Sequence, residues 1–160
     1  MRNVVIRSIF GFFLLISILG FNSSGKVVDQ SAAGDMILGD WITAEKMLKV
    51  RVFKENGEYK AIVLWFYDEH YKCKLKDCTD ENNPDPALRT RKLLGMEVLT
   101  GLVYSPSRNM WVNGKVYDSN SGNTYESIAT MPNKNKLYAR GYYLFEWLGR
   151  NMEFDRLPSN

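Results

Sequence analysis

The chain has 160 residues, of which 45% are apolar and 13% aromatic, a composition typical of one globular domain with its own core. Its 21 basic and 18 acidic residues give a net charge of +3, and two of the basic residues lie within residues 1–25, which contain no acid. The rest of the chain is nearly neutral. This argues against a nucleic-acid-binding protein, because such proteins concentrate basic residues on one face.

Residues 1–25 have the features of a secretory signal peptide. Arg2 and Arg7 precede an apolar run from Ile9 to Phe21, and small polar residues follow it. The run is shorter than the roughly 20 residues that cross a bilayer as a helix, so we expect cleavage and no membrane span afterwards. An uncleaved anchor is the alternative. The sequence therefore predicts a periplasmic or secreted protein.

From residue 34 to residue 157 the chain reads as one domain of short strands. The first strand lies within Asp35 to Thr43. Met47 to Lys54 alternates apolar and basic residues, which is typical of a half-buried strand. Asn56-Gly57 is the strongest short signal for a tight hairpin, and Glu58 to Tyr67 is the return strand.

The later strands follow the same pattern. Leu93 to Tyr104 resumes the alternation, with internal glycines that indicate a bend or bulge. The clearest hairpin is Met110 to Met131, where two runs rich in β-branched and aromatic residues flank the turn at 119–122. Leu137 to Trp147 and Met152 to Arg156 complete the series.

About eight strands at a spacing of roughly 10 to 12 residues, with tight turns and no convincing amphipathic helix, predict an all-β fold. We favour an antiparallel up-and-down barrel, because a meander of this many strands closes on itself and leaves no free edge. A Greek-key sandwich is the alternative. It would need longer crossovers than these turns provide.

Residues 68–92 form one long irregular insertion, in which Pro84 and Pro86 cannot donate ladder hydrogen bonds. We expect a solvated loop, since its acidic and amide residues do not match the spacing of a calcium loop. Cys73 and Cys78 are the only cysteines, and we expect them to form a local disulfide in an oxidising compartment. Zinc is the weaker alternative, because His70 is the only histidine, so we expect no metal.

An ordered set of residues resembles the bacterial exported domain-of-unknown-function family 2147. The set is Gly39-Asp40-Trp41, Asn83 with Arg89 and Arg91, Leu94-Gly95, Trp111 with Gly114, Tyr117-Asp118, Gly122 with Tyr125, and Leu137 with Arg140-Gly141-Tyr142. The resemblance implies a lipocalin-like eight-stranded barrel in the periplasm or the secreted fraction. It implies no established activity, cofactor or catalytic residue.

The lipocalin comparison assigns a structural role to three residues. Lipocalins carry a Gly-x-Trp in the first strand and an Arg after the last strand that packs over the Trp. Gly39 and Trp41 match the first part, and Arg156 is placed to match the second. The insertion is not a general lipocalin feature, so no lipocalin ligand is transferred.

Strand alternation also predicts the inner face of the barrel. The predicted lining residues are Val50, Val52, Met96, Val98, Val112, Tyr125, Ala139 and Tyr143. Small residues beside aromatics, such as Gly114, Ala139 and Gly141, favour space for a ligand. The first functional hypothesis is therefore a carrier or sensor of a small apolar or amphipathic molecule.

The second hypothesis is an envelope interaction protein with a packed barrel. It would contact a protein or glycan through the insertion and exposed aromatics such as Tyr71, Trp111 or Trp147. We expect no enzyme, since no Gly-x-Ser-x-Gly elbow or phosphate-binding glycine loop occurs. The carboxylates of Glu97, Asp118, Glu126 and Glu146 are expected to be solvated surface charges rather than a glycosidase pair.

Overall fold

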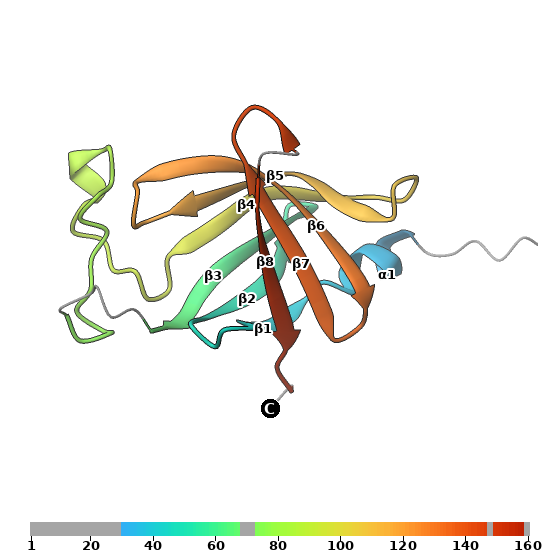
Figure 1. The fold of residues 1–160 in the computed structure, drawn as a ribbon, viewed down its shortest axis with the longest axis horizontal. Helices are drawn as coiled ribbons and strands as arrows, with labels where there is room; N and C mark the ends of the chain where they lie inside the picture. The colour runs from blue at the N-terminus through green and yellow to red at the C-terminus, as the bar shows by residue number, and fades with distance from the viewer. Residues whose placement is uncertain (1–29, 68–72, 147–148, 159–160) are drawn as a thin grey trace, which may run out of the picture.

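The computed structural model describes residues 30–67, 73–146 and 149–158, and these form a closed barrel of eight antiparallel strands (Figure 1). The elements are α1 (Gln30–Asp35), β1 (Gly39–Thr43), β2 (Leu48–Glu55), β3 (Glu58–Phe66), the 3-10 helix η1 (Pro86–Leu88), β4 (Glu97–Ser105), β5 (Met110–Asp118), β6 (Asn123–Asn133), β7 (Lys136–Tyr142) and β8 (Arg150–Arg156). Each strand pairs with its neighbour in sequence, and β8 pairs back with β1. The predicted up-and-down barrel is confirmed. The proposed signal peptide, His70, Tyr71 and Trp147 lie outside the described residues.

Two predicted turns set the register of their hairpins. Asn56 and Gly57 have φ values of 52° and 84°, the positive angles that a two-residue turn between β2 and β3 requires. Between β5 and β6, the Asp118 carboxylate accepts hydrogen bonds from the Asn120 N–H at 3.0 Å and the Ser121 hydroxyl at 2.8 Å. Both turns form where the local sequence predicts them.

The barrel bends at irregular positions in β3 and β4. Gly101 has a φ of 66°, and the pairing of β3 with β4 shifts register between Tyr59 and Ala61. The bulge predicted from the strand glycines is confirmed. Two strands are shorter than predicted: β4 begins at Glu97 rather than Leu93, and β7 ends at Tyr142.

One end of the barrel is covered by α1, a six-residue helix that the sequence pattern does not predict (Figure 1). Asp35 accepts hydrogen bonds from the Tyr59 hydroxyl and the Lys54 ammonium, both at 2.7 Å. At Gly34 a Cβ atom would overlap the Tyr59 hydroxyl oxygen, so this close approach requires glycine. No helix among the described residues is long and apolar enough to cross a membrane.

The attachment of α1 is expected to weaken in acid. Hydrogen bonds from Lys54, and then from Tyr59, lower the pKa of Asp35 from its usual value of 3.8. A lowered folded-state pKa contributes stability above the unfolded pKa, and this contribution is lost as the pH falls through the folded value. We expect the wild-type melting temperature to exceed that of Asp35→Asn at pH 7, and the gap to shrink below about pH 4. A gap that stays constant from pH 7 to pH 3 would contradict this linkage.

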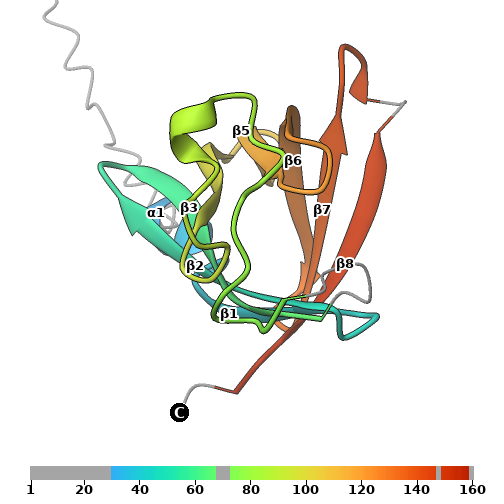
Figure 2. The same ribbon diagram turned by 90° about the vertical axis from the view of Figure 1, so that its left-hand side faces the viewer.

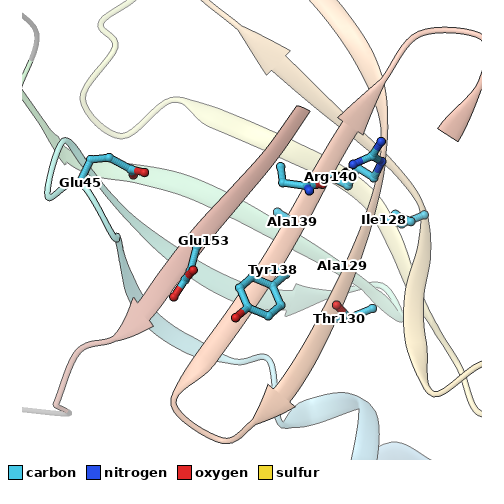
Figure 3. A pocket seen from close by; sticks show the side chains of 9 residues that line it. Glu45, Ile128, Ala129, Thr130, Tyr138, Ala139, Arg140 and Glu153 are labelled. Carbon is cyan, nitrogen blue, oxygen red and sulfur yellow. Dashed lines mark hydrogen bonds between the residues drawn. The ribbon is translucent and has the colours of Figure 1, made fainter. Parts of the chain in front are cut away.

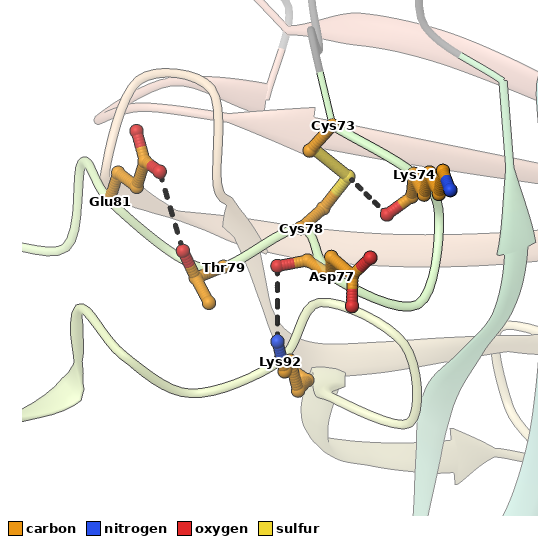
Figure 4. Close-up of a disulfide and its surroundings, with 7 residues drawn as sticks. All are labelled: Cys73, Lys74, Asp77, Cys78, Thr79, Glu81 and Lys92. Carbon is orange, nitrogen blue, oxygen red and sulfur yellow. Dashed lines mark hydrogen bonds between the residues drawn. A yellow bond between two sulfur atoms is a disulfide. The ribbon is translucent and has the colours of Figure 1, made fainter.

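The described part of the insertion begins with a disulfide between Cys73 and Cys78, as predicted (Figure 4). Beyond it, Thr79 forms an isolated β-bridge with Lys92, and the Lys92 ammonium donates a hydrogen bond to the Asp77 carbonyl at 3.1 Å. The two arms of the insertion therefore run side by side. They lie at the end of the barrel away from α1 (Figure 1), the side that faces the viewer in Figure 2.

The prediction of a solvated insertion is wrong at its centre, where Asp80 and Asn83 are buried. Asp80 accepts hydrogen bonds from the Tyr117 hydroxyl at 2.7 Å, the Asn83 amide at 2.6 Å and the Arg91 guanidinium at 2.9 Å. Burial, and secondarily the Asp80 carboxylate, raises the pKa of Tyr117, so its hydroxyl keeps the proton that it donates. These bonds fasten the insertion to β5. The described residues contain no group of three or more metal-ligating side chains.

Candidate functional site: the open half of the barrel

The half of the barrel next to α1 is tightly packed by aromatic side chains. Trp41 has no exposed surface, and its indole N–H donates to the Ile37 carbonyl at 2.9 Å. The Trp111 indole N–H donates to the Gly34 carbonyl at 3.0 Å, and its ring meets Tyr104 at 5.1 Å between centroids. These contacts join the strands to the segment around α1 and close the half of the barrel next to it.

The structure brings Trp41 and Arg156 together at this closed end. The guanidinium carbon of Arg156 lies 4.1 Å from the centre of the Trp41 ring. Arg156 also donates hydrogen bonds to the carbonyls of Leu38 at 2.7 Å and Met36 at 2.5 Å. A Cβ at Gly39 would meet the same guanidinium at 3.0 Å, so Gly39 leaves room for it. We assign these contacts a structural role, because main-chain carbonyls hold the Arg156 guanidinium.

The opposite half is less filled. By strand alternation, several apolar side chains face inward there but remain partly exposed: Leu48, Leu99, Val116, Tyr125, Ala139 and Met152. Met152 is 43% exposed, although Phe154, two residues further along the same face of β8, is only 6% exposed. We call this set of residues the open half. In this half the inward side chains are therefore partly open to solvent.

The predicted lining residues fall into several groups. Val50 and Val52 lie in the buried barrel core, and Val98 and Ala139 pack against that core while partly exposed. Met96 belongs to a second buried cluster, with Cys78 and Leu93 of the insertion. Tyr125 shares the inner face of β6 with Ala129. Val112 and Tyr143 do not line the interior, and their prediction is wrong.

The error at Val112 comes from a neighbouring aromatic and a bulge. Trp111 is 3% exposed and points into the core, so Val112, the next residue, points outward. The pairing of β5 with β6 then shifts register between Trp111 and Gly114, and Asn113 has a φ of 63°. The same burial corrects the hypothesis that Trp111 is an exposed interface residue. Tyr143 lies beyond the end of β7 and is 68% exposed.

The glycines expected to leave gaps are partly filled by their neighbours. A Cβ at Gly114 would meet the Leu102 side chain at 2.6 Å, and one at Gly141 would meet Val116 at 3.3 Å. Leucine and valine side chains therefore occupy this space. Ala139, half-buried between Ala129 of β6 and Met152 of β8, remains the small residue that borders the open half.

A separate groove lies on the outer face of the barrel (Figure 3). Its lining comes from β6, β7, β8 and the turn before β2: Glu45, Ile128, Ala129, Thr130, Tyr138, Ala139, Arg140, Asn151 and Glu153. Two of its charged groups are already bonded, because Glu153 accepts from Lys136 and Arg140 donates to Asn151. We therefore assign the candidate site to the open half rather than to this groove.

Two comparisons with known proteins agree with the barrel. A family model described as "Uncharacterized protein conserved in bacteria (DUF2147)" matches residues 39–156. The fold is similar to the solved structure of protein HP1028 from the human pathogen Helicobacter pylori, which is described as belonging to the lipocalin family. The two chains are 25% identical, with a TM-score of 0.64 over 76% of this chain and 82% of that chain. The comparison with curated proteins found no match.

Proposed function

The chain belongs to the bacterial DUF2147 family, and from its barrel geometry we propose that it binds a small apolar or amphipathic molecule in the open half. The observation that carries this proposal is the contrast between the two halves of the barrel. Aromatic side chains fill the half next to α1, whereas inward apolar side chains such as Met152 stay partly exposed in the other. An eight-stranded barrel has room for one small ligand.

We propose that the protein is a non-enzymatic carrier or sensor that works in the periplasm or after secretion. We propose that residues 1–25 are removed on export. The disulfide between Cys73 and Cys78 supports an oxidising compartment. The similarity to a lipocalin-family protein supports the binding of a small molecule, because the barrel interior is where such a fold has space.

We expect Ala139→Phe to abolish uptake of the neutral fluorescent probe N-phenyl-1-naphthylamine while leaving the melting temperature nearly unchanged. The larger ring would occupy the space that the probe needs in the open half. In a filled interior, the same change would overpack the barrel and cost about 1 to 3 kcal/mol. Probe fluorescence titration and thermal melts measure the two effects.

Glu126→Phe is the matched control, because Glu126 is exposed on the outer face of the neighbouring strand. This variant should bind the probe as the wild type does. Strong destabilisation by Ala139→Phe, together with no probe binding by the wild type, would reject the carrier.

A second candidate function is contact with a protein or glycan partner, and the loop between β7 and β8 favours it. Tyr143, Leu144 and Phe145 are 68%, 75% and 55% exposed, and Leu144 has an unusual φ of 68° for a leucine. The Arg140 guanidinium donates to the Glu146 carbonyl at 2.5 Å and holds the base of the loop. An exposed apolar loop of this kind is prone to form an interface.

A further inference from the structure

Ser127 lies at the centre of the inner face of β6, where its surroundings are apolar. It is only 4% exposed, and its strand neighbours are Gly114 on β5 and Gly141 on β7. Leu99 and Leu102 lean into the space beside Gly114, and Val116 leans into the space beside Gly141. The charged residue on this layer is Arg150, which pairs with Gly141 from β8 and is exposed.

The Ser127 hydroxyl makes no hydrogen bond with any residue that the structure describes. The other buried polar residues of the described chain are paired; for example, Thr43 accepts from the main-chain N–H groups of Met47 and Leu48. No side-chain nitrogen or oxygen in the described ranges is both sealed from solvent and without a partner. The Ser127 oxygen must therefore open onto space inside the barrel, even though the residue is nearly buried.

Burying a hydroxyl in an apolar layer lowers the stability of the folded protein unless the hydroxyl has a hydrogen-bond partner. Water can serve when the barrel is empty, and a ligand group that replaces water must supply an equivalent bond. A charged ligand group would lose its hydration at the depth of Ser127, whereas Arg150, the charge on this layer, is exposed and lies two strands away. A neutral hydroxyl or carbonyl oxygen can form a hydrogen bond with Ser127 without placing a charge at this depth, since a serine hydroxyl both donates and accepts.

We propose that the ligand combines an aliphatic body with a neutral oxygen group, a hydroxyl or carbonyl, that hydrogen-bonds to Ser127. This proposal rests on the carrier function proposed above and names the chemical class of its ligand. The aliphatic body lies against the apolar side chains of the open half. Ser127 then discriminates a single-chain alcohol or ketone from a hydrocarbon of the same size.

The test compares 1-octanol with nonane, in which a methyl group replaces the hydroxyl, as competitors of N-phenyl-1-naphthylamine. Ser127→Ala is expected to weaken 1-octanol binding by about 3- to 10-fold, the usual worth of one hydrogen bond, and to leave nonane binding unchanged. The melting temperature of the variant should not fall, because no protein hydrogen bond is removed. Thr130→Val, which removes an outward-facing hydroxyl from the same strand, should change neither affinity.

The outcomes separate the two proposals. If wild-type protein binds the probe and both competitors, but Ser127→Ala leaves 1-octanol binding unchanged or weakens both competitors equally, the role of Ser127 is overturned and the carrier stands. If the wild type binds neither the probe nor the competitors, the carrier is overturned and the ligand class with it.

Discussion

Replacing Trp41 with alanine is expected to lower the free energy of unfolding by about 3 to 5 kcal/mol, the usual cost of removing a large buried aromatic side chain. The indole is fully buried, bonds the Ile37 carbonyl and lies under the Arg156 guanidinium. Its loss would open a cavity where the first and last strands meet. Urea denaturation followed by far-ultraviolet circular dichroism measures the change.

Trp65→Ala is the control for this experiment. Trp65 is half-buried on the outer face, where the Lys49 ammonium lies 5.4 Å from its ring centre. We expect it to cost about 1 kcal/mol, because an exposed cation–π contact contributes little. Arg156→Ala should cost less than Trp41→Ala, since it leaves the indole in place. Identical urea midpoints for Trp41→Ala and the wild type would show that Trp41 does not close the barrel.

Asp80→Ala is expected to have the second large effect, a loss of roughly 3 kcal/mol in the free energy that holds the insertion on the barrel. The carboxylate has no exposed surface, and three donors converge on it. Removing it leaves the Arg91 charge and the Tyr117 hydroxyl without their acceptor. The insertion should therefore detach while the barrel remains folded.

Trypsin provides the measurement, because the described part of the insertion contains five cleavage sites: Lys74, Lys76, Arg89, Arg91 and Lys92. We expect cleavage there to become many times faster in Asp80→Ala, with little change in the thermal melt of the barrel. Tyr117→Phe removes one of the three donors and should cost only about 1 kcal/mol. Unchanged cleavage of Asp80→Ala would mean that other contacts hold the insertion.

Local signals account for the parts of the fold that were predictable. Alternating residues mark the faces of β2, and Asn56-Gly57 supplies the positive φ angles of its turn. These features depend on residues close together in the sequence. By contrast, α1 has six residues, too few to show a helical period, and it is held by distant partners such as Trp111.

The other features that the sequence did not predict depend on contacts between distant positions. Asp80 and Tyr117 are 37 positions apart, so nothing near either residue indicates their hydrogen bond. Alternation predicts which face a side chain occupies but not how deep it lies. It could not separate Val50, in the closed core, from Ala139, at the border of the open half. A bulge also reverses the faces, as at Val112, and strict alternation ignores the Asn113-Gly114 pair at which this bulge falls.

The pairing of β1 with β8 has a consequence for the order in which the chain can fold. Arg156 bonds the carbonyl of Leu38, 118 positions earlier, and its strand supplies the second edge partner of β1. During synthesis, at about 5 to 20 residues per second, the earlier strands emerge long before this partner exists. Closure must wait until β8 has been synthesised. A chain that completes its fold so late remains flexible enough to be threaded through a translocation channel, which is compatible with the export proposed above.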